Sequence, residues 1–132
     1  MKVDFSIFVL GGFYLATIGA YVFFEMVPIN YRPVLIEGNL EVSYPSSTTM
    51  LVMCVMPTAA LELNKRIKNR VLRNCVVGVV VCFTVFMVVA RLLSGVHWFS
   101  DIVGGALLSA GLVGMYCYVL GCAKIKCYKY HK

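Results

Sequence analysis

Charged residues are scarce in this chain of 132 residues: Asp, Glu, Lys and Arg together make up only 14%, and six of them are acidic. A typical soluble domain is about 25% charged and about 45–50% apolar. Here Ala, Val, Ile, Leu, Met, Phe, Trp, Tyr and Cys make up 61%, and the mean hydropathy is +0.85. A chain this short cannot bury so much apolar surface in one water-soluble core. The shortage of charge therefore excludes a soluble globule and predicts a membrane protein.

Proline is also rare, with four residues, and no short repeat is present. These absences exclude collagen-like and proline-rich disordered chains.

Four stretches contain no charged residue at all. They lie between Asp4 and Glu25, Glu41 and Glu62, Arg73 and Arg91, and Asp101 and Lys124, and contain 20, 20, 17 and 22 residues. A helix needs roughly 20 apolar residues to cross a bilayer, with about 17–25 as the working range. Only helices and closed barrels satisfy backbone groups in lipid, and runs without two-residue alternation favour helices. We therefore predict an all-α bundle of four transmembrane spans, at about 5–25, 47–63, 73–92 and 101–123, in a single membrane-embedded domain over residues 1–132.

The net charge of +6 is distributed unevenly along this four-span arrangement. Ten of the twelve cations fall on one side: Lys2, Lys65, Arg66, Lys68, Arg70, Arg73, Lys124, Lys126, Lys129 and Lys132. The positive-inside rule makes that side cytoplasmic, so we predict a multi-pass protein of the cell membrane with both termini in the cytoplasm. The cations then indicate the orientation of the chain in the membrane and favour contact with anionic lipids. A nucleic-acid partner is not expected. Arg32 and Arg91 alone lie on the outer side.

The six cysteines do not form an extracellular disulfide framework, because none lies in an outer loop. Cys54, Cys75, Cys82 and Cys117 fall in or beside the spans, where small buried hydrophobic residues are expected. Cys122, Cys127 and His131 offer an alternative as metal ligands, but their spacing matches no standard zinc pattern. We predict neither a metal nor another cofactor.

Two loops on the outer side, at 25–47 and 91–101, carry the polar residues that could bind a ligand or take part in catalysis. They contain two arginines, a hydroxyl-rich helix start at Ser46, and His97 four residues before Asp101. Each feature has a simpler explanation: arginines that extend to the membrane surface, an ordinary helix cap, and part of an interfacial aromatic belt.

Taken together, these residues predict a phosphate site with an activated histidine. A spacing of four places His97 and Asp101 on one side of a helical turn, so the carboxylate can orient the imidazole. The guanidinium groups and the N–H groups of a helix start suit a dianionic phosphate.

The same residues resemble the signatures of the type 2 phosphatidic acid phosphatase superfamily. Arg91, His97 and Asp101 have the spacing of its third signature, Arg32-Pro33 resembles the end of the first, and Pro45-Ser46-Ser47-Thr48 resembles the second. The resemblance covers about residues 20–115. It implies a helical core similar to that of haloperoxidases, and metal-independent cleavage of lipid phosphomonoesters or pyrophosphates.

The resemblance also implies a role for each residue. His97 would accept the phosphoryl group, Asp101 would orient it, and Arg91 would act beside them in catalysis. Arg32, Arg91, Ser46, Ser47 and Thr48 would form the substrate-binding set, with the backbone amide of Ser47 on the phosphoryl oxygens. Water would then hydrolyse the phosphohistidine.

Three positions depart from the family pattern. Glu25 stands where a lysine is expected, Ala90 where a serine is usual, and Thr48 where the second signature has the histidine that protonates the leaving oxygen. His131 lies on the opposite side and cannot replace that acid. Because a pyrophosphate ester needs less help from an acid, we expect a preference for isoprenoid or other lipid pyrophosphates over phosphatidic acid.

Other functions stay open at this point. The second candidate is a catalytically impaired relative that binds lipid phosphate or plays a structural role. A small transporter would need an ionisable residue inside a span, for which Glu62 is the nearest candidate.

The family commonly has six spans, so the chain is expected to lack the first two. Homo-oligomers or partner helices could then pack at Gly11-Gly12 or Gly104-Gly105. These glycines could equally pack the core of a single chain.

Overall fold

The computed structural model describes residues 5–130, without the side chains of 124–128 and 130. In this part of the chain the secondary structure consists of four α-helices, α1 (Phe5–Met26), α2 (Ser47–Arg66), α3 (Arg70–Leu93) and α4 (Phe99–Tyr130), and no strand. The prediction of an all-α bundle of four helices is confirmed. The predicted bounds of the first three agree to within three residues, and α4 continues seven residues beyond the predicted end of the last span.

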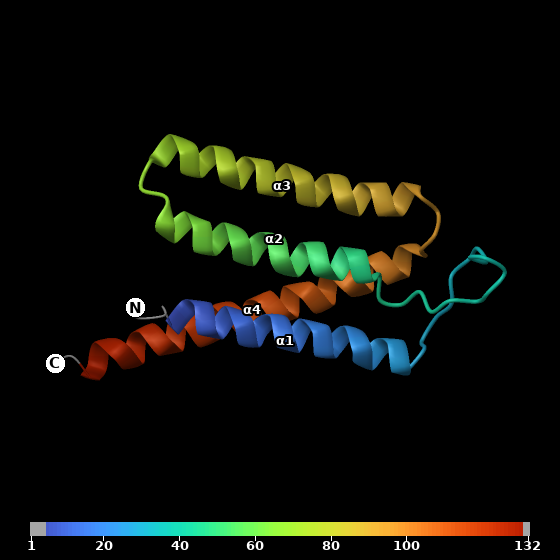
Figure 1. The fold of residues 1–132 in the computed structure, drawn as a ribbon, viewed down its shortest axis with the longest axis horizontal. Coiled ribbons are helices and arrows are strands. Elements are labelled where there is room, and N and C mark those ends of the chain that lie inside the picture. The colour runs from blue at the N-terminus through green and yellow to red at the C-terminus, as the bar shows by residue number, and fades with distance from the viewer. Residues whose placement is uncertain (1–4, 131–132) are drawn as a thin grey trace.

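Helix α2 occupies the centre of the bundle. It contacts α1, α3 and α4, whereas α3 packs mainly on α2 and has no fully buried residue. Figure 1 shows α3 along one side of α2, with α1 and α4 crossing on the other side. The link from α2 to α3, at 67–69, and the link from α3 to α4, at 94–98, are both short.

Within residues 5–130, three helices are long and apolar enough to cross a membrane: α1, α3 and residues 99–123 of α4. Helix α2 is not among them, because it begins with Ser47, Thr48 and Thr49 and ends with charged residues. Its central position accounts for this composition. A helix surrounded by other helices exposes less surface to lipid and can carry more polar residues.

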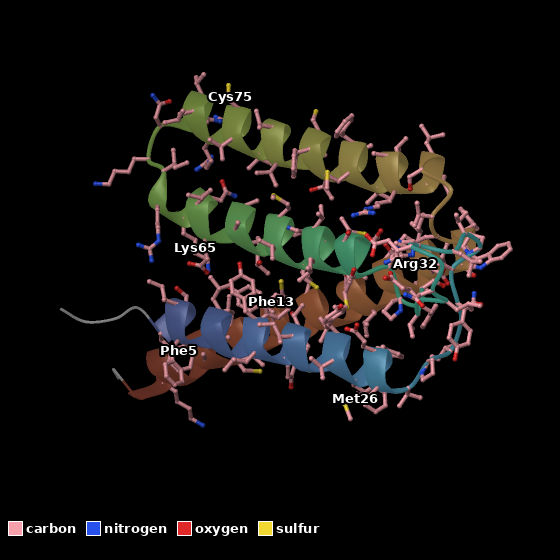
Figure 2. The ribbon with its side chains drawn as sticks, turned by 45° about the vertical axis from the view of Figure 1, so that its right-hand side comes forward. Phe5, Phe13, Met26, Arg32, Lys65 and Cys75 are labelled. Atoms are coloured by element: carbon pink, nitrogen blue, oxygen red, sulfur yellow. The ribbon has the colours of Figure 1, made fainter. Side chains whose placement is uncertain are left out.

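The two ends of the bundle differ in charge. The start of α1, the end of α4 and the 67–69 link lie at one end, and the long 27–46 loop and the 94–98 link lie at the other (Figure 1). Figure 2 shows Lys65 near the first end and Arg32 in the loop at the second. Residues 65–73, with five cations, thus lie far from Arg32.

A small apolar core joins α1, α2 and α4. Phe13, Met50, Cys54 and Tyr116 form it, and the Phe13 and Tyr116 rings lie 5.2 Å apart. Buried hydroxyl groups beside this core bond to helix carbonyls, as Ser109 Oγ does to Gly105 O at 2.7 Å. Each hydroxyl thereby keeps a partner away from water.

Glu62 ties three helices together at the end away from the loops. Its carboxylate is mostly buried and accepts hydrogen bonds from Ser6 Oγ at 3.2 Å, Lys65 Nζ at 2.7 Å and Tyr116 OH at 2.8 Å. A buried carboxylate with three donors is stabilised in its charged form. Glu62 therefore has a structural role that accounts for its place in the helix without transport.

The glycine pair at 104–105 lets α4 approach the loop and the start of α2. A Cβ at Gly104 would overlap with the Tyr44 ring, and one at Gly105 would lie 3.2 Å from the Ser46 carbonyl oxygen. These glycines pack inside the chain, so they do not offer an open surface to a second copy. Gly11 and Gly12 have open space around them.

Candidate active site

The site lies at the end of the bundle where the 27–46 loop meets the 94–98 link. The loop folds back on itself: Arg32 N–H donates to Glu41 O at 3.0 Å, and residues 36–39 close a tight turn. Glu37 and Gly38 have φ of 50° and 80° in that turn, the positive values that a two-residue hairpin turn of type I′ requires. The hairpin brings Arg32 and Glu41 side by side.

Four hydrogen bonds join this loop to the 94–98 link and α4. The pairs are His97 Nδ1 with Ser43 O at 3.2 Å, Trp98 Nε1 with Tyr31 O at 3.0 Å, Asn30 Nδ2 with Asp101 Oδ1 at 3.4 Å, and Ser46 N with Asp101 O at 3.2 Å. Two of the four use backbone carbonyls of the loop as acceptors. The loop backbone, and not only its side chains, therefore positions His97.

His97 is buried, and its contact with the loop backbone selects one tautomer of the neutral ring. A carbonyl oxygen can only accept, so Nδ1 carries the proton that it donates to Ser43 O, and in the neutral ring Nε2 then has the lone pair. Burial lowers the pKa of His97 below its usual 6.5, and the positive charge of Arg32 lowers it further. The Ser43 carbonyl and Asp101 oppose this shift, and Arg91 adds a smaller decrease in the pKa.

Asp101 has partners other than the histidine. Its side chain is fully buried, Oδ2 accepts from the Trp98 backbone N–H at 3.0 Å, and Oδ1 accepts from Asn30. Trp98 directly precedes α4, and Asp101 is the third residue of that helix. The Asp101 carboxylate therefore caps the N-terminus of α4. The distance from Oδ2 to His97 Nδ1 is 3.9 Å, too long for a hydrogen bond. The direct Asp–His hydrogen bond expected from the spacing is not formed, and the Ser43 carbonyl takes its place.

The start of α2 provides backbone donors. Ser46 precedes the helix with an extended backbone, but its side chain caps no N–H group and instead accepts from Thr49 Oγ1 at 3.1 Å. The first N–H groups of a helix have no intrahelical acceptor, so those of Ser47, Thr48 and Thr49 are not used by the α-helix itself. Ser46 is completely buried, and Thr48 is half-buried.

The two arginines of the site differ in environment. Arg32 Nε lies 3.4 Å from Glu41 Oε2, yet the geometry makes no hydrogen bond and leaves this buried nitrogen without an acceptor. Arg91 is half-buried in the last turn of α3, where its charge influences His97. Arg32 therefore has unused hydrogen-bonding capacity.

A pocket of about 420 Å³ opens between α1, the loop and the start of α2. Arg32, Ser47 and His97 line it. The other predicted site residues, Asp101, Arg91, Ser46 and Thr48, are not part of its lining. Ser43, which lines the pocket and is almost fully buried, has a hydroxyl group without a hydrogen-bond partner.

A family model matches residues 29–122, with the description PAP2 superfamily. This match covers more than half of the chain. The chain belongs to the PAP2 superfamily. The PAP2 superfamily generally contains phosphatases, so the match places the chain in a phosphatase-type family. The family match and the three apolar helices in the described residues together support a membrane protein. No curated protein and no solved structure matched the chain.

Sequence reasoning missed several residues of this PAP2 site. Ser43 contributes a backbone carbonyl and an unused hydroxyl, Asn30 binds Asp101, and Glu41 pairs with Arg32. A backbone acceptor leaves no trace in side-chain chemistry, so Ser43 could not be found by motif. Asn30 and Glu41 were visible only as polar residues of a long loop.

No group of three or more His, Cys, Asp or Glu side chains in the described part of the chain is arranged to hold a metal ion. His131 and the side chain of Cys127 lie outside the described residues. The thiols of Cys54, Cys75, Cys82, Cys117 and Cys122 are free. In Figure 2, Cys75 projects from the side of α3 away from α2.

Proposed function

We propose that this protein is an integral membrane lipid phosphatase that forms a phosphohistidine at His97. The observation that carries the proposal is the environment of His97, which is buried, bonded through Nδ1 to the Ser43 carbonyl, and part of the same pocket as Arg32. Burial and Arg32 lower the pKa of His97, which favours the neutral ring. A neutral imidazole with a fixed tautomer has a nucleophilic lone pair at Nε2.

In the proposed reaction, Nε2 attacks the phosphorus atom while the bond to the leaving oxygen breaks. Arg32, Arg91 and the N–H groups of Ser47 and Thr48 stabilise the charge on the phosphoryl oxygens. The imidazolium that forms keeps its Nδ1–H on Ser43, and the buried Asp101 carboxylate at 3.9 Å stabilises its positive charge. A water molecule then attacks the phosphohistidine, which releases phosphate and restores His97.

Thr48 sets the leaving group that the site can use. A threonine hydroxyl does not donate a proton near neutral pH, and general acid catalysis is worth about 10²–10⁴-fold. A lipid pyrophosphate expels a phosphate, which needs less protonation than an alkoxide. We therefore favour isoprenoid pyrophosphates, or other lipid pyrophosphates, over phosphatidic acid.

Thr48 also supports a second candidate function, a relative that binds lipid phosphate or acts structurally without turnover. The pocket, with Arg32 in its lining, suits such binding as well as catalysis. The two functions differ in whether His97 ever becomes phosphorylated.

We also propose an orientation. The five cations between Lys65 and Arg73 favour the cytoplasm for their end of the bundle. Both termini would then be cytoplasmic, and the pocket would face the extracytoplasmic side at the depth of the lipid headgroups.

The deciding experiment is phosphate release from a lipid pyrophosphate by the purified protein, together with acid-quench detection of a phosphorylated histidine. Wild-type protein should release phosphate and carry the label, and His97→Ala should do neither. A wild-type protein that binds the lipid but never releases phosphate would support the binding function instead.

A further inference from the structure

The wall of the pocket formed by α1 has a different chemistry from the rest. Tyr21, Phe24 and Glu25 line the pocket from the last turns of α1. Their spacing of three and four residues places them on one face of the helix. This face offers a carboxylate and two aromatic rings to the pocket. Tyr44 supplies a third ring, packed edge-on against Phe24 with the centroids 5.8 Å apart.

The Glu25 carboxylate and the aromatic ring faces do not suit a phosphate. A carboxylate repels an anion, and the faces of aromatic rings carry partial negative charge. Glu41, the other acidic residue of the pocket, is paired with Arg32. Glu25 makes no ion pair with any residue in the described part of the chain, and the Tyr21 side chain is close enough to interact with it electrostatically.

An uncompensated carboxylate beside three aromatic rings is the arrangement that recognises an organic cation. Ammonium groups bind over aromatic faces and form charge-assisted hydrogen bonds with carboxylates. We infer that the α1 wall is an ammonium subsite, built from Glu25, Phe24, Tyr21 and Tyr44, beside the phosphate-binding part of the pocket. The preferred phosphomonoester is then a zwitterionic lipid phosphate, with an ammonium group on the alcohol close to the phosphate.

This inference rests on the proposed phosphate site at Arg32 and His97 and names a substrate class for it. It also bears on the missing acid at position 48. An ammonium group near the ester oxygen stabilises the negative charge that develops there when the bond to phosphorus breaks. As a leaving group, such an alcohol depends less on a proton donated by the protein, as does the phosphate that leaves when a pyrophosphate is cleaved.

Two headgroup probes of similar size isolate the contribution of the ammonium group. O-Phosphoethanolamine carries it, and ethyl phosphate lacks it. Binding of each to the full chain in detergent micelles can be measured from the shift in the unfolding temperature as a function of probe concentration. We expect O-phosphoethanolamine to bind about tenfold more tightly than ethyl phosphate to the wild-type protein.

Substitutions on the α1 wall should remove this preference. Glu25 is exposed at the end of α1, so the Glu25→Gln variant should still fold. Its affinity ratio for the two probes should be close to one. Phe24→Leu should lower the ratio partly. Glu37→Gln is the matched control, because Glu37 lies at the hairpin tip outside the pocket lining. It should keep the wild-type ratio. Arg32→Gln should weaken both probes together.

Equal affinity of the wild-type protein for the two probes, or an unchanged ratio in Glu25→Gln, would overturn the ammonium subsite. Hydrolysis of a long-chain 2-aminoalkyl phosphate, compared with the alkyl phosphate of equal length, separates this result from the fate of the proposed function. If neither lipid is hydrolysed while the binding preference and its loss in Glu25→Gln persist, the phosphatase proposal fails and the subsite stands. If both are hydrolysed at equal rates with equal probe affinities, the subsite fails and the phosphatase proposal stands.

Discussion

The Nδ1 atom of His97 lies 3.2 Å from the carbonyl oxygen of Ser43, while the nearest oxygen of Asp101 is 3.9 Å away. A backbone group therefore fixes the imidazole. No substitution at position 43 removes that carbonyl, so the loop must stay in place for the ring to keep its tautomer. Asp101 serves this purpose indirectly, because it binds the loop through Asn30 and caps α4 through Trp98 N–H.

The first prediction concerns pH. Because burial and Arg32 lower the pKa of His97, the neutral and nucleophilic form persists below pH 6.5. We expect kcat/KM for a lipid pyrophosphate to stay high down to that lowered pKa and to fall only in more acidic solution. Arg32→Gln should move the acidic limb toward higher pH, even though its rates are lower. An acidic limb that does not move would show that His97 is not the titrating group.

The same shift affects stability. Between pH 6.5 and the lowered pKa, the unfolded chain binds a proton at position 97 that the folded chain does not bind. The contribution of His97 to the free energy of unfolding should therefore decrease as the pH falls through this range. His97→Phe should show a smaller decrease in thermal unfolding experiments.

The second prediction separates the structural role of Asp101 from a catalytic one. Asp101→Ala leaves the Trp98 N–H and the Asn30 amide without their buried acceptor, at a cost of about 2–3 kcal/mol in the free energy of unfolding. Asn30→Ala removes one donor and should cost less. If Asp101 holds the loop through Asn30, the double variant should be less destabilised than the sum of the two single variants. Additive effects would contradict this coupling.

The third prediction concerns the contact between Gly104 and Tyr44. Gly104→Ala places a methyl group where the Tyr44 ring lies, and such overpacking costs about 1–3 kcal/mol. Gly111→Ala is the matched control in the same helix, where nothing lies within 4 Å of the added Cβ. It should raise the free energy of unfolding by about 0.5–1 kcal/mol. Tyr44→Ala combined with Gly104→Ala should recover part of the loss, as measured by thermal unfolding in detergent.

The fourth prediction tests the pairing of Arg32. Glu41→Gln removes the carboxylate at 3.4 Å from Arg32 Nε and leaves the guanidinium free for an anion. Since partly exposed ion pairs are worth ~0.2–1 kcal/mol, inhibition by inorganic phosphate should become roughly two- to fivefold tighter. Glu37→Gln should leave phosphate inhibition unchanged. Weaker inhibition in Glu41→Gln would mean that Glu41 positions Arg32 more than it competes with the ligand.

The fifth prediction concerns the missing acid. Thr48→His restores a group that can protonate an alkoxide. Hydrolysis of phosphatidic acid should therefore rise by about 10²-fold, the lower end of the range for general acid catalysis. Hydrolysis of a lipid pyrophosphate should change far less. Phosphate-release assays on both substrates measure the two effects. Faster cleavage of phosphatidic acid than of pyrophosphate by the wild-type protein would refute the proposed preference.

The sequence alone determined the helices and the grouping of the polar residues. Runs without charge define where helices form, because only a helix satisfies backbone groups in lipid. Chain order then brings the 25–47 and 91–101 loops to the same end of the bundle. The spacing of Arg91, His97 and Asp101 identified the family, and the match over residues 29–122 confirms it.

The tertiary structure decided which atoms meet within those loops. The partner of His97 is a carbonyl of Ser43, the partners of Asp101 are Asn30 and a backbone N–H group, and Gly104 makes room for Tyr44. These contacts depend on the path of a 20-residue loop whose hydrogen bonds are mostly to backbone atoms. Backbone acceptors are the same at every residue, so sequence motifs do not reveal them. The carboxylate of Glu25 likewise became part of the pocket only because α1 ends beside the hairpin.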